Sequence, residues 1–391
     1  MKILIAPDKF KDALDAEAAA DAMAAGVRAA GPAAAVDLCP LGDGGEGTGR
    51  ILAAALGATE QTAPVLDPLG RRRVARWWSA PRARLAIIEM AEASGLMLLA
   101  AGERNALHTS SYGTGQLLAA ARAAGCARVL LCVGGSATVD GGAGCLQALG
   151  WRFFDAAGGE LRAPMSGGTL AEIARIEPAQ AGSSELGRAG AERAGGLQVD
   201  VLCDVDNPLL GPRGAAPVFG PQKGATPEGV ARLEAGLQHW ANLLEAAHGR
   251  QVREVPGGGA AGGVPAGLFA ALGARLRPGF DEVAQHVRLA ERLAGCDLCL
   301  TGEGRIDDQT AGGKVVAGVA HLTKERGVPA VALVGAARLR PGQMLAEVIA
   351  ALGLAGIVVI TPPGTALPQA LAATADNLRR AAEAVVSRRR A

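Results

Sequence analysis

The densest group of charged residues able to do chemistry lies in the run TGEGRIDDQTAGGK, residues 301–314. It contains Glu303, Arg305, Asp307 and Lys314, and it follows an apolar segment that has the pattern of a buried strand. Carboxylates can hold a divalent cation, and Arg and Lys can neutralise charge that develops on a phosphoryl group. A surface loop does not require this combination, so we interpret the run as part of a phosphoryl-transfer site.

A glycine-rich turn, GGSATVDGGAG at residues 134–144, follows another predicted strand and opens a predicted helix. Small residues allow backbone N–H groups to approach a polyphosphate, and hydroxyl or carboxylate side chains can bond to it or to its metal. The Gly-Lys-Ser/Thr ending of a P-loop is missing. The alternative is a glycine turn without a ligand. We expect nucleotide binding by Gly134, Gly135, Ser136, Thr138, Asp140 and Gly141.

Two further segments carry polar groups suited to a metal or a phosphate. In CDVDNP, Asp204 and Asp206 offer hard oxygen donors for Mg2+, and a carboxylate there could accept a hydroxyl proton. The alternative is a turn whose side chains bond the backbone ahead of Pro208. In FGPQKGA, Lys223 stands between turn residues, where a point charge on phosphate fits.

The ends of the first two predicted strands also carry charge, in DKFKD and DGGEGT. Ligands of open α/β sheets bind outside the carboxyl ends of the strands, where helix N-termini attract anions. Ordinary turn and helix-cap chemistry is the alternative for either segment. The candidate substrate-binding residues here are Asp8, Lys11, Asp43 and Glu46.

The elements that must position these groups alternate between strand and helix at both ends of the chain. Apolar strand patterns at 1–7 and 36–41 alternate with helical patterns at 16–30 and 46–56, and the rhythm returns after residue 296. Between them, residues 62–92 have short strands that favour antiparallel or mixed pairing. We expect an α/β protein with two domains and an active-site cleft between them: a discontinuous Rossmann-like parallel-sheet domain, residues 1–60 plus 286–391, and an inserted mixed α/β domain, residues 61–285.

Bulk properties agree with two domains, because 391 residues exceed the size of about 250–300 at which a single core stops growing. Lys and Arg total 39 against 38 Asp and Glu, without a basic stripe, so nucleic acid is not expected as a partner. The start MKILIAPD enters a strand pattern directly, and no run of about 20 apolar residues occurs. We therefore expect no membrane partner, a cytoplasmic location, and cysteines that act as small core residues.

The chain resembles the bacterial glycerate kinases that form 2-phosphoglycerate, over essentially its whole length. The stretches that carry the resemblance are IAPDKFKDAL, LGDGGEGT, TSSYGTGQL, GGSATVDGGAG, CDVDNPLLG, FGPQKGA, GGGAAGG and TGEGRIDDQTAGGK. The resemblance implies that ATP and D-glycerate are the substrates and Mg2+ the cofactor. It leaves open the oligomeric state, monomer or homodimer, and the less expected product 3-phosphoglycerate. Lys9 and Val139 depart from the usual family pattern.

Together with the resemblance, these clusters allow a hypothetical role to be assigned to each residue. The sequence itself gives only the positions of the residues. The expected catalytic residues are Asp204, Arg305, Asp307 and Lys314, and substrate binding is expected at Asp8, Lys11, Asp43, Glu46 and Arg305. Nucleotide binding is expected at Lys223 as well as at the glycine-rich turn. The expected metal ligands are Asp140, Asp204 and Glu303. Polar motif positions without an assigned role are Thr114 and Asn207.

Two other functions remain alternatives. A NAD(P)-dependent reductase of 2-hydroxy acids would also use strands that end in glycine-rich turns, but no Gly-x-Gly-x-x-Gly opens the first helix. A non-catalytic metabolite sensor would need an added partner or DNA-binding module, and the chain has no obvious one.

Overall fold

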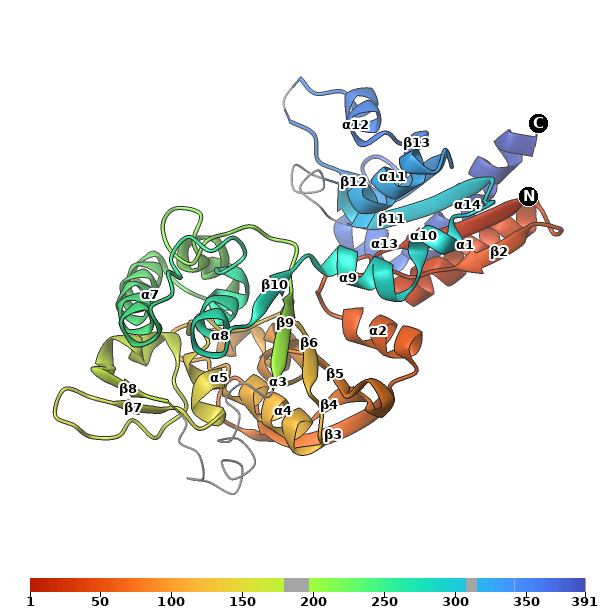
Figure 1. The fold of residues 1–391 in the computed structure, drawn as a ribbon. Coiled ribbons are helices and arrows are strands. Elements are labelled where there is room, and N and C mark those ends of the chain that lie inside the picture. Colours follow the sequence, from red (N-terminus) through yellow and green to blue (C-terminus); the bar gives the residue numbers. More distant parts are fainter. Residues whose placement is uncertain (179–196, 307–314, 341, 391) are drawn as a thin grey trace. The chain divides into compact units, whose positions relative to one another are not determined.

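The computed structural model describes residues 1–178, 197–306, 315–340 and 342–390. The chain divides into two compact units (Figure 1). The first unit contains both chain ends, as Met1–Asp43, Arg50–Ala55 and Pro278–Ala391, and the second comprises Gly44–Gly49 and Leu56–Arg277. The domain limits expected from the sequence, after residues 60 and 285, lie some residues from these and stay a prediction.

A five-stranded parallel sheet forms the first unit. Its order is β13 (Gly356–Val359), β12 (Ala330–Ala337), β11 (Leu298–Ile306), β1 (Lys2–Pro7) and β2 (Ala35–Leu38). The chain builds outward from β1 in one direction to β2 and in the other to β11, so the order reverses between β1 and β11. This is a doubly wound sheet, and the reversal marks the place where such sheets bind ligands, at the carboxyl ends of the strands.

Helices cover both faces of this sheet, which explains why its strands are apolar throughout. On one face, α1 (Ala16–Ala30) and α14 (Thr374–Arg390) pack together over Ile3, Ile5 and Leu300. On the other, α11 (Val315–Glu325) contacts β1, β11 and β12 and buries its Val residues. The remaining helices of the unit are α9 (Gly279–His286), α10 (Leu289–Arg292), α12 (Leu345–Leu352) and α13 (Leu367–Ala372).

The first unit corrects one expectation: β11 does not end before the charged run. Glu303 and Arg305 belong to the strand itself, in register with Val334 and Ala336 of β12. Pairing continues this far because β12 runs on to Ala337 and because glycines allow the two backbones to approach. A Cβ atom on Gly335 would lie 2.4 Å from the carbonyl oxygen of Gly304.

The second unit has a mixed six-stranded sheet. Its order is β10 (Arg275–Arg277), β9 (Gln198–Leu202), β6 (Arg128–Cys132), β5 (Leu85–Glu89), β4 (Arg72–Ala80) and β3 (Thr59–Leu66). Strands β3, β4 and β5 pair antiparallel, which confirms the expectation for residues 62–92. Strands β5, β6, β9 and β10 pair parallel. A separate antiparallel pair joins β7 (Arg152–Phe154) and β8 (Arg175–Glu177).

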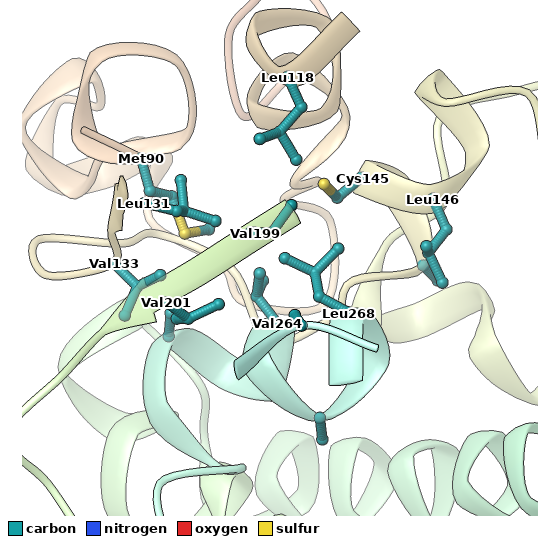
Figure 2. Packing of buried hydrophobic residues seen from close by; sticks show 14 of the residues in the cluster. Met90, Leu118, Leu131, Val133, Cys145, Leu146, Val199, Val201, Val264 and Leu268 are labelled. Atoms are coloured by element: carbon teal, nitrogen blue, oxygen red, sulfur yellow. The ribbon is translucent and has the colours of Figure 1, made fainter. Parts of the chain in front are cut away.

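The core of the second unit lies between this sheet and its helices (Figure 2). Val199 and Val201 of β9 pack there with side chains from α4 (Tyr112–Ala123), α5 (Ala143–Ala148) and α8 (Val264–Leu272). Trp240 of α7 (Pro227–His248) is also fully buried. Burial of each large apolar side chain contributes about 1.5–3 kcal/mol. Cys145 belongs to this core, as the sequence analysis expected of most cysteines.

The other α-helices in the described part of the second unit are α3 (Ala91–Ser94), α6 (Ala215–Phe219) and the start of α2 (Thr48–Leu56), a helix that both units share. Across the described ranges, no helix combines the length and the apolar character that a bilayer crossing requires.

Candidate functional site

Three neighbouring parallel strands of the six-stranded sheet, β5, β6 and β9, end at the same edge. Glu89 is the last residue of β5, the glycine-rich turn begins after β6, and Asp204 follows β9. We call this edge, with segment 44–49 and turn 134–142, the glycine edge. The corresponding edge of the five-stranded sheet, with Asp8, Lys9, Asp43, Glu303 and Arg305, is the charged edge.

Segment 44–49 runs along the glycine edge from strand to strand. A Cβ atom on Gly44 would lie 2.5 Å from the carbonyl oxygen of Leu202, where β9 ends. A Cβ atom on Gly134 would lie 2.3 Å from Cα of Gly45, and the Gly134 N–H donates to the Gly44 carbonyl oxygen at 3.1 Å. Gly44 also has a φ of +88°. Both glycines are therefore required for the two turns to touch.

Glu89 anchors the far end of this segment and was not among the residues predicted from the sequence. Its carboxylate accepts the Gly49 N–H at 2.7 Å and also bonds the Gly47 backbone, at the start of α2. Burial raises the pKa of Glu89, while these backbone bonds act in the opposite direction. The signal in the sequence was a carboxylate ending the otherwise apolar strand LAIIE, all of which is buried.

Asp140 fixes the glycine-rich turn from within. One carboxylate oxygen accepts the Ser111 backbone N–H at 2.8 Å, its hydroxyl at 2.7 Å and the Gly144 N–H at 3.3 Å. The other accepts the Gly142 N–H at 3.1 Å. The side chain is fully buried, and this burial raises its pKa despite the four hydrogen bonds. In this arrangement Asp140 organises the turn, and it has no exposed surface for a cation.

Lys223 brings a buried cation to the same turn. Its Nζ donates to the Ser136 hydroxyl and to the Thr138 carbonyl oxygen, both at 2.8 Å. Burial lowers the pKa of Lys223 to about 7, and the negative charge of Asp140 opposes that shift. The hydroxyl oxygen of Thr138 is buried without a hydrogen-bond partner. The turn therefore combines a buried ammonium group with hydroxyls and backbone amides, the groups that bind phosphate oxygens.

The segment GGGAAGG, residues 257–263, supports the turn from behind. The Gly141 N–H donates to the Gly262 carbonyl oxygen at 2.9 Å, and a Cβ atom on Gly262 would lie 2.0 Å from the carbonyl oxygen of Thr138. The indole N–H of Trp240 donates to the Gly141 carbonyl oxygen at 2.9 Å. This packing explains why a glycine-rich stretch far along the chain accompanies the turn.

Asp204 is half-buried at the end of β9, whereas Asp206 forms an exposed ion pair with Arg213, 2.7 Å between Arg Nη2 and Asp Oδ1. Asn207 donates to the Arg213 carbonyl oxygen, and Thr114 donates to the Ser94 hydroxyl, so both have structural partners. Within the described ranges, no group of three or more His, Cys, Asp or Glu residues could hold a metal.

At the charged edge, Lys9 lies between two carboxylates. Its Nζ is 3.1 Å from Oδ1 of Asp43 and 3.9 Å from Oδ1 of Asp8. The Asp8 N–H donates to the carbonyl oxygen of Gly302, which ties the end of β1 to β11. The structure thus brings together Asp8 and Asp43, which the sequence analysis had assigned to the substrate.

Glu303 and Arg305 are two residues apart in β11, so they extend to the same face of the strand. Glu303 is buried and Arg305 exposed. Lys11 is exposed too, and a Cβ atom on Gly304 would lie 3.2 Å from its backbone nitrogen, so these segments adjoin. Asp307 and Lys314 lie outside the described residues.

Glu46 lies beside the glycine-rich turn. A Cβ atom on Gly135 would lie 2.3 Å from the Glu46 carboxylate, so Glu46 belongs to the glycine edge in the second unit. Chemically, the glycine edge offers phosphate-binding groups, and the charged edge offers carboxylates and cations suited to a small hydroxy acid.

Comparisons with known proteins agree over almost the entire chain. Residues 3–390 match the model of the glycerate kinase family. The "Glycerate 2-kinase" of Escherichia coli K12 is 39% identical over 99% of this chain and 97% of its own length. The "Glycerate kinase" of Halalkalibacterium halodurans is 44% identical over 85% of both chains.

A solved structure agrees with the fold. A crystal structure described as glycerate kinase 2 of Salmonella typhimurium LT2 superimposes with a TM-score of 0.80 at 39% identity, covering 100% of this chain and 98% of that one. The comparisons give no support to a reductase or a metabolite sensor. By sequence over nearly its whole length and by fold, the chain belongs to the glycerate kinase family.

Proposed function

We propose that this protein is an ATP-dependent kinase that phosphorylates the 2-hydroxyl group of D-glycerate. Membership of the glycerate kinase family supports the reaction class, and similarity to a protein named glycerate 2-kinase supports the 2-position. The observation that carries the proposal within this chain is the glycine edge, where turn 134–142 is held by Asp140 and supplied with the buried ammonium group of Lys223.

The nucleotide phosphates are assigned to the glycine edge. Small residues in turn 134–142 leave room for an anion to approach the backbone, and Ser136 adds a hydroxyl beside the Lys223 ammonium group. Desolvation of Lys223 strengthens its attraction for phosphate when a nucleotide excludes water. Phosphate would in turn favour the protonated form of this lysine.

Glycerate is assigned to the charged edge. Arg305 is exposed on β11 and can pair with the substrate carboxylate through two parallel hydrogen bonds. Asp8 and Asp43 can accept hydrogen bonds from the substrate hydroxyls. Transfer then requires one hydroxyl to be aligned with the γ-phosphate, and this positioning carries most of the catalytic effect. The shared cleft expected from the sequence stays a prediction.

Asp204 is the residue that we assign to Mg2+. Magnesium is commonly held by one or two carboxylates together with substrate phosphates and waters, and Asp204 is a half-buried carboxylate beside the glycine-rich segments. Bound Mg2+ would neutralise charge on the phosphates. Asp204 could instead orient the reacting hydroxyl. The assignments of Asp140 and Glu303 as ligands stay predictions, and the enclosed geometry of Asp140 favours a positioning role.

The proposal is tested with purified protein, D-glycerate and Mg-ATP, following the product by 31P NMR. We expect 2-phosphoglycerate to form, and we expect turnover to stop in excess EDTA. Exclusive formation of 3-phosphoglycerate would correct the position of attack, and ATP consumption without any phosphoglycerate would refute the function. Cytoplasmic location and a monomeric or homodimeric state stay predictions.

A further inference from the structure

Lys9 connects the ends of two adjacent strands at the charged edge. β1 lies between β2 and β11, and Asp8 directly follows β1. Asp43 comes after β2, and the Lys9 ammonium group lies 3.1 Å from its carboxylate. The Lys9 backbone N–H also donates to the Asp8 carboxylate at 2.7 Å. One residue thus contacts both carboxylates, through its backbone and its side chain.

These groups are partly removed from water. The Asp8 side chain is 8% exposed, Lys9 is 26% exposed and Asp43 is 28% exposed. Two carboxylates in such surroundings repel each other and any third anion more strongly than they would on an open surface. Glu303, buried in the neighbouring β11, adds further acidic character to the same edge.

A small hydroxy acid faces a conflict at this edge. Its hydroxyl groups need acceptors such as Asp8 and Asp43, whereas its own carboxylate is repelled by them. An ammonium group between the two aspartates resolves the conflict, because it offsets their charge and fixes their oxygen atoms in place. Because Lys9 directly follows Asp8 in the chain, the ammonium group and both carboxylates all lie at the carboxyl ends of β1 and β2.

We propose that Lys9 is a positioning residue for the hydroxy-acid substrate, holding Asp8 and Asp43 so that their oxygens accept hydroxyl groups while an anionic carboxylate is tolerated. This rests on the assignment of glycerate to the charged edge. Loss of the ammonium group weakens glycerate binding and leaves nucleotide binding intact. Arg, which keeps the charge, restores most of the affinity.

The test compares Lys9→Met, Lys9→Arg and Lys2→Met in the full chain. Lys2 lies at the other end of β1, where its Nζ donates to the Ala294 carbonyl oxygen at 2.9 Å, so it is a matched lysine control. Calorimetry gives Kd for D-glycerate and for an ATP analogue, alongside kcat, both KM values and thermal melts.

We expect Lys9→Met to weaken glycerate binding ~10-fold or more, with the nucleotide Kd within about twofold. Lys9→Arg should recover most of the loss, and Lys2→Met should match wild type. Unchanged glycerate affinity in Lys9→Met overturns the proposal, as does a parallel loss for both ligands with a lowered melting temperature. Wild type that binds glycerate without phosphorylating it would refute the proposed function alone. Wild type that does not bind it would refute this inference too.

Discussion

The glycine edge and the charged edge occupy equivalent positions on their sheets, yet they are built differently. At the glycine edge, backbone packs on backbone, and the polar side chains that organise it, Asp140 and Lys223, are buried. At the charged edge, Lys11 and Arg305 are exposed and Lys9 is partly so. The first edge is therefore formed largely by packed backbone, whereas the second presents side chains.

This difference predicts how each edge responds to mutation. A change in the buried network should disturb stability and activity together, because donors or acceptors lose their partners. A change among the exposed charges should alter substrate affinity with little effect on folding, because solvent can replace the lost interaction in the free protein.

The largest effect is expected for Asp140→Asn. Asn has one acceptor oxygen where the carboxylate has two, so its NH2 group would face backbone N–H donors that now bond to Asp140. We expect a loss of about 2 kcal/mol or more in the free energy of unfolding, and at least ~10-fold lower turnover. Urea unfolding and steady-state kinetics measure both.

The matched control is Asp155→Asn. Asp155 lies in an exposed turn, where one of its carboxylate oxygens accepts two backbone N–H groups. Water can compensate there, so its stability should change by less than about 1 kcal/mol. An Asp140→Asn variant with unchanged stability and lost Mg2+ dependence would instead make Asp140 a metal ligand.

A more selective effect is expected for Arg305→Lys. Lys cannot reproduce the two parallel hydrogen bonds that Arg makes with a carboxylate. The KM for glycerate should rise by ~30-fold, equivalent to about 2 kcal/mol, while the KM for ATP stays within a few-fold. The measurements are steady-state kinetics, with each substrate varied in turn, and a thermal melt. Together they distinguish a role in glycerate binding from a role in ATP binding or in stability.

Arg50→Lys serves as the control, since it alters only an exposed ion pair with Asp15. Weaker ATP binding alone in Arg305→Lys would relocate Arg305 to the phosphates. Lower stability with both KM values raised would make it a structural residue of β11.

The smallest effect is a pH dependence of stability from Lys223. Its pKa is lowered to about 7 in the folded protein, whereas an unfolded lysine titrates near 10.4. Between these values the unfolded chain binds more protons, so this residue makes stability rise with pH from about 7 to 10. Below pH 7 the lysine is protonated in both the folded and the unfolded chain, so it adds no pH dependence to the stability there.

Lys223→Met should remove this rise, whereas Met in place of the exposed Lys324 should preserve it. Urea unfolding at pH 6, 8 and 9.5 tests the prediction. Identical pH profiles for wild type and Lys223→Met would show that Lys223 remains charged in the fold.

Much of the fold could be predicted because its signals are local. The apolar strands of the first unit and the short strands at 62–92 follow from periodicity and turn residues, and sequence comparison confirmed the family. The extent of β11 could not be predicted, because it depends on pairing with β12, which lies after α11 in the chain.

The site was less accessible to sequence reasoning. Polar residues at strand ends could be identified, but the buried contacts of Asp140 with Ser111, and of Lys223 with Ser136, join segments far apart in the chain. Glu46 lies in the second unit, against Gly135, whereas Asp8 and Asp43 lie in the first, because one glycine run passes from one unit into the other after Asp43. The roles of all these residues stay predictions.

A crystal structure with glycerate and a non-hydrolysable ATP analogue tests the central claim most directly. We predict triphosphate density beside Gly134–Ser136 and the Lys223 ammonium group, and glycerate beside Asp8 and Arg305. Triphosphate bound at the end of β1, or glycerate bound against turn 134–142, would contradict the assignment of the two edges.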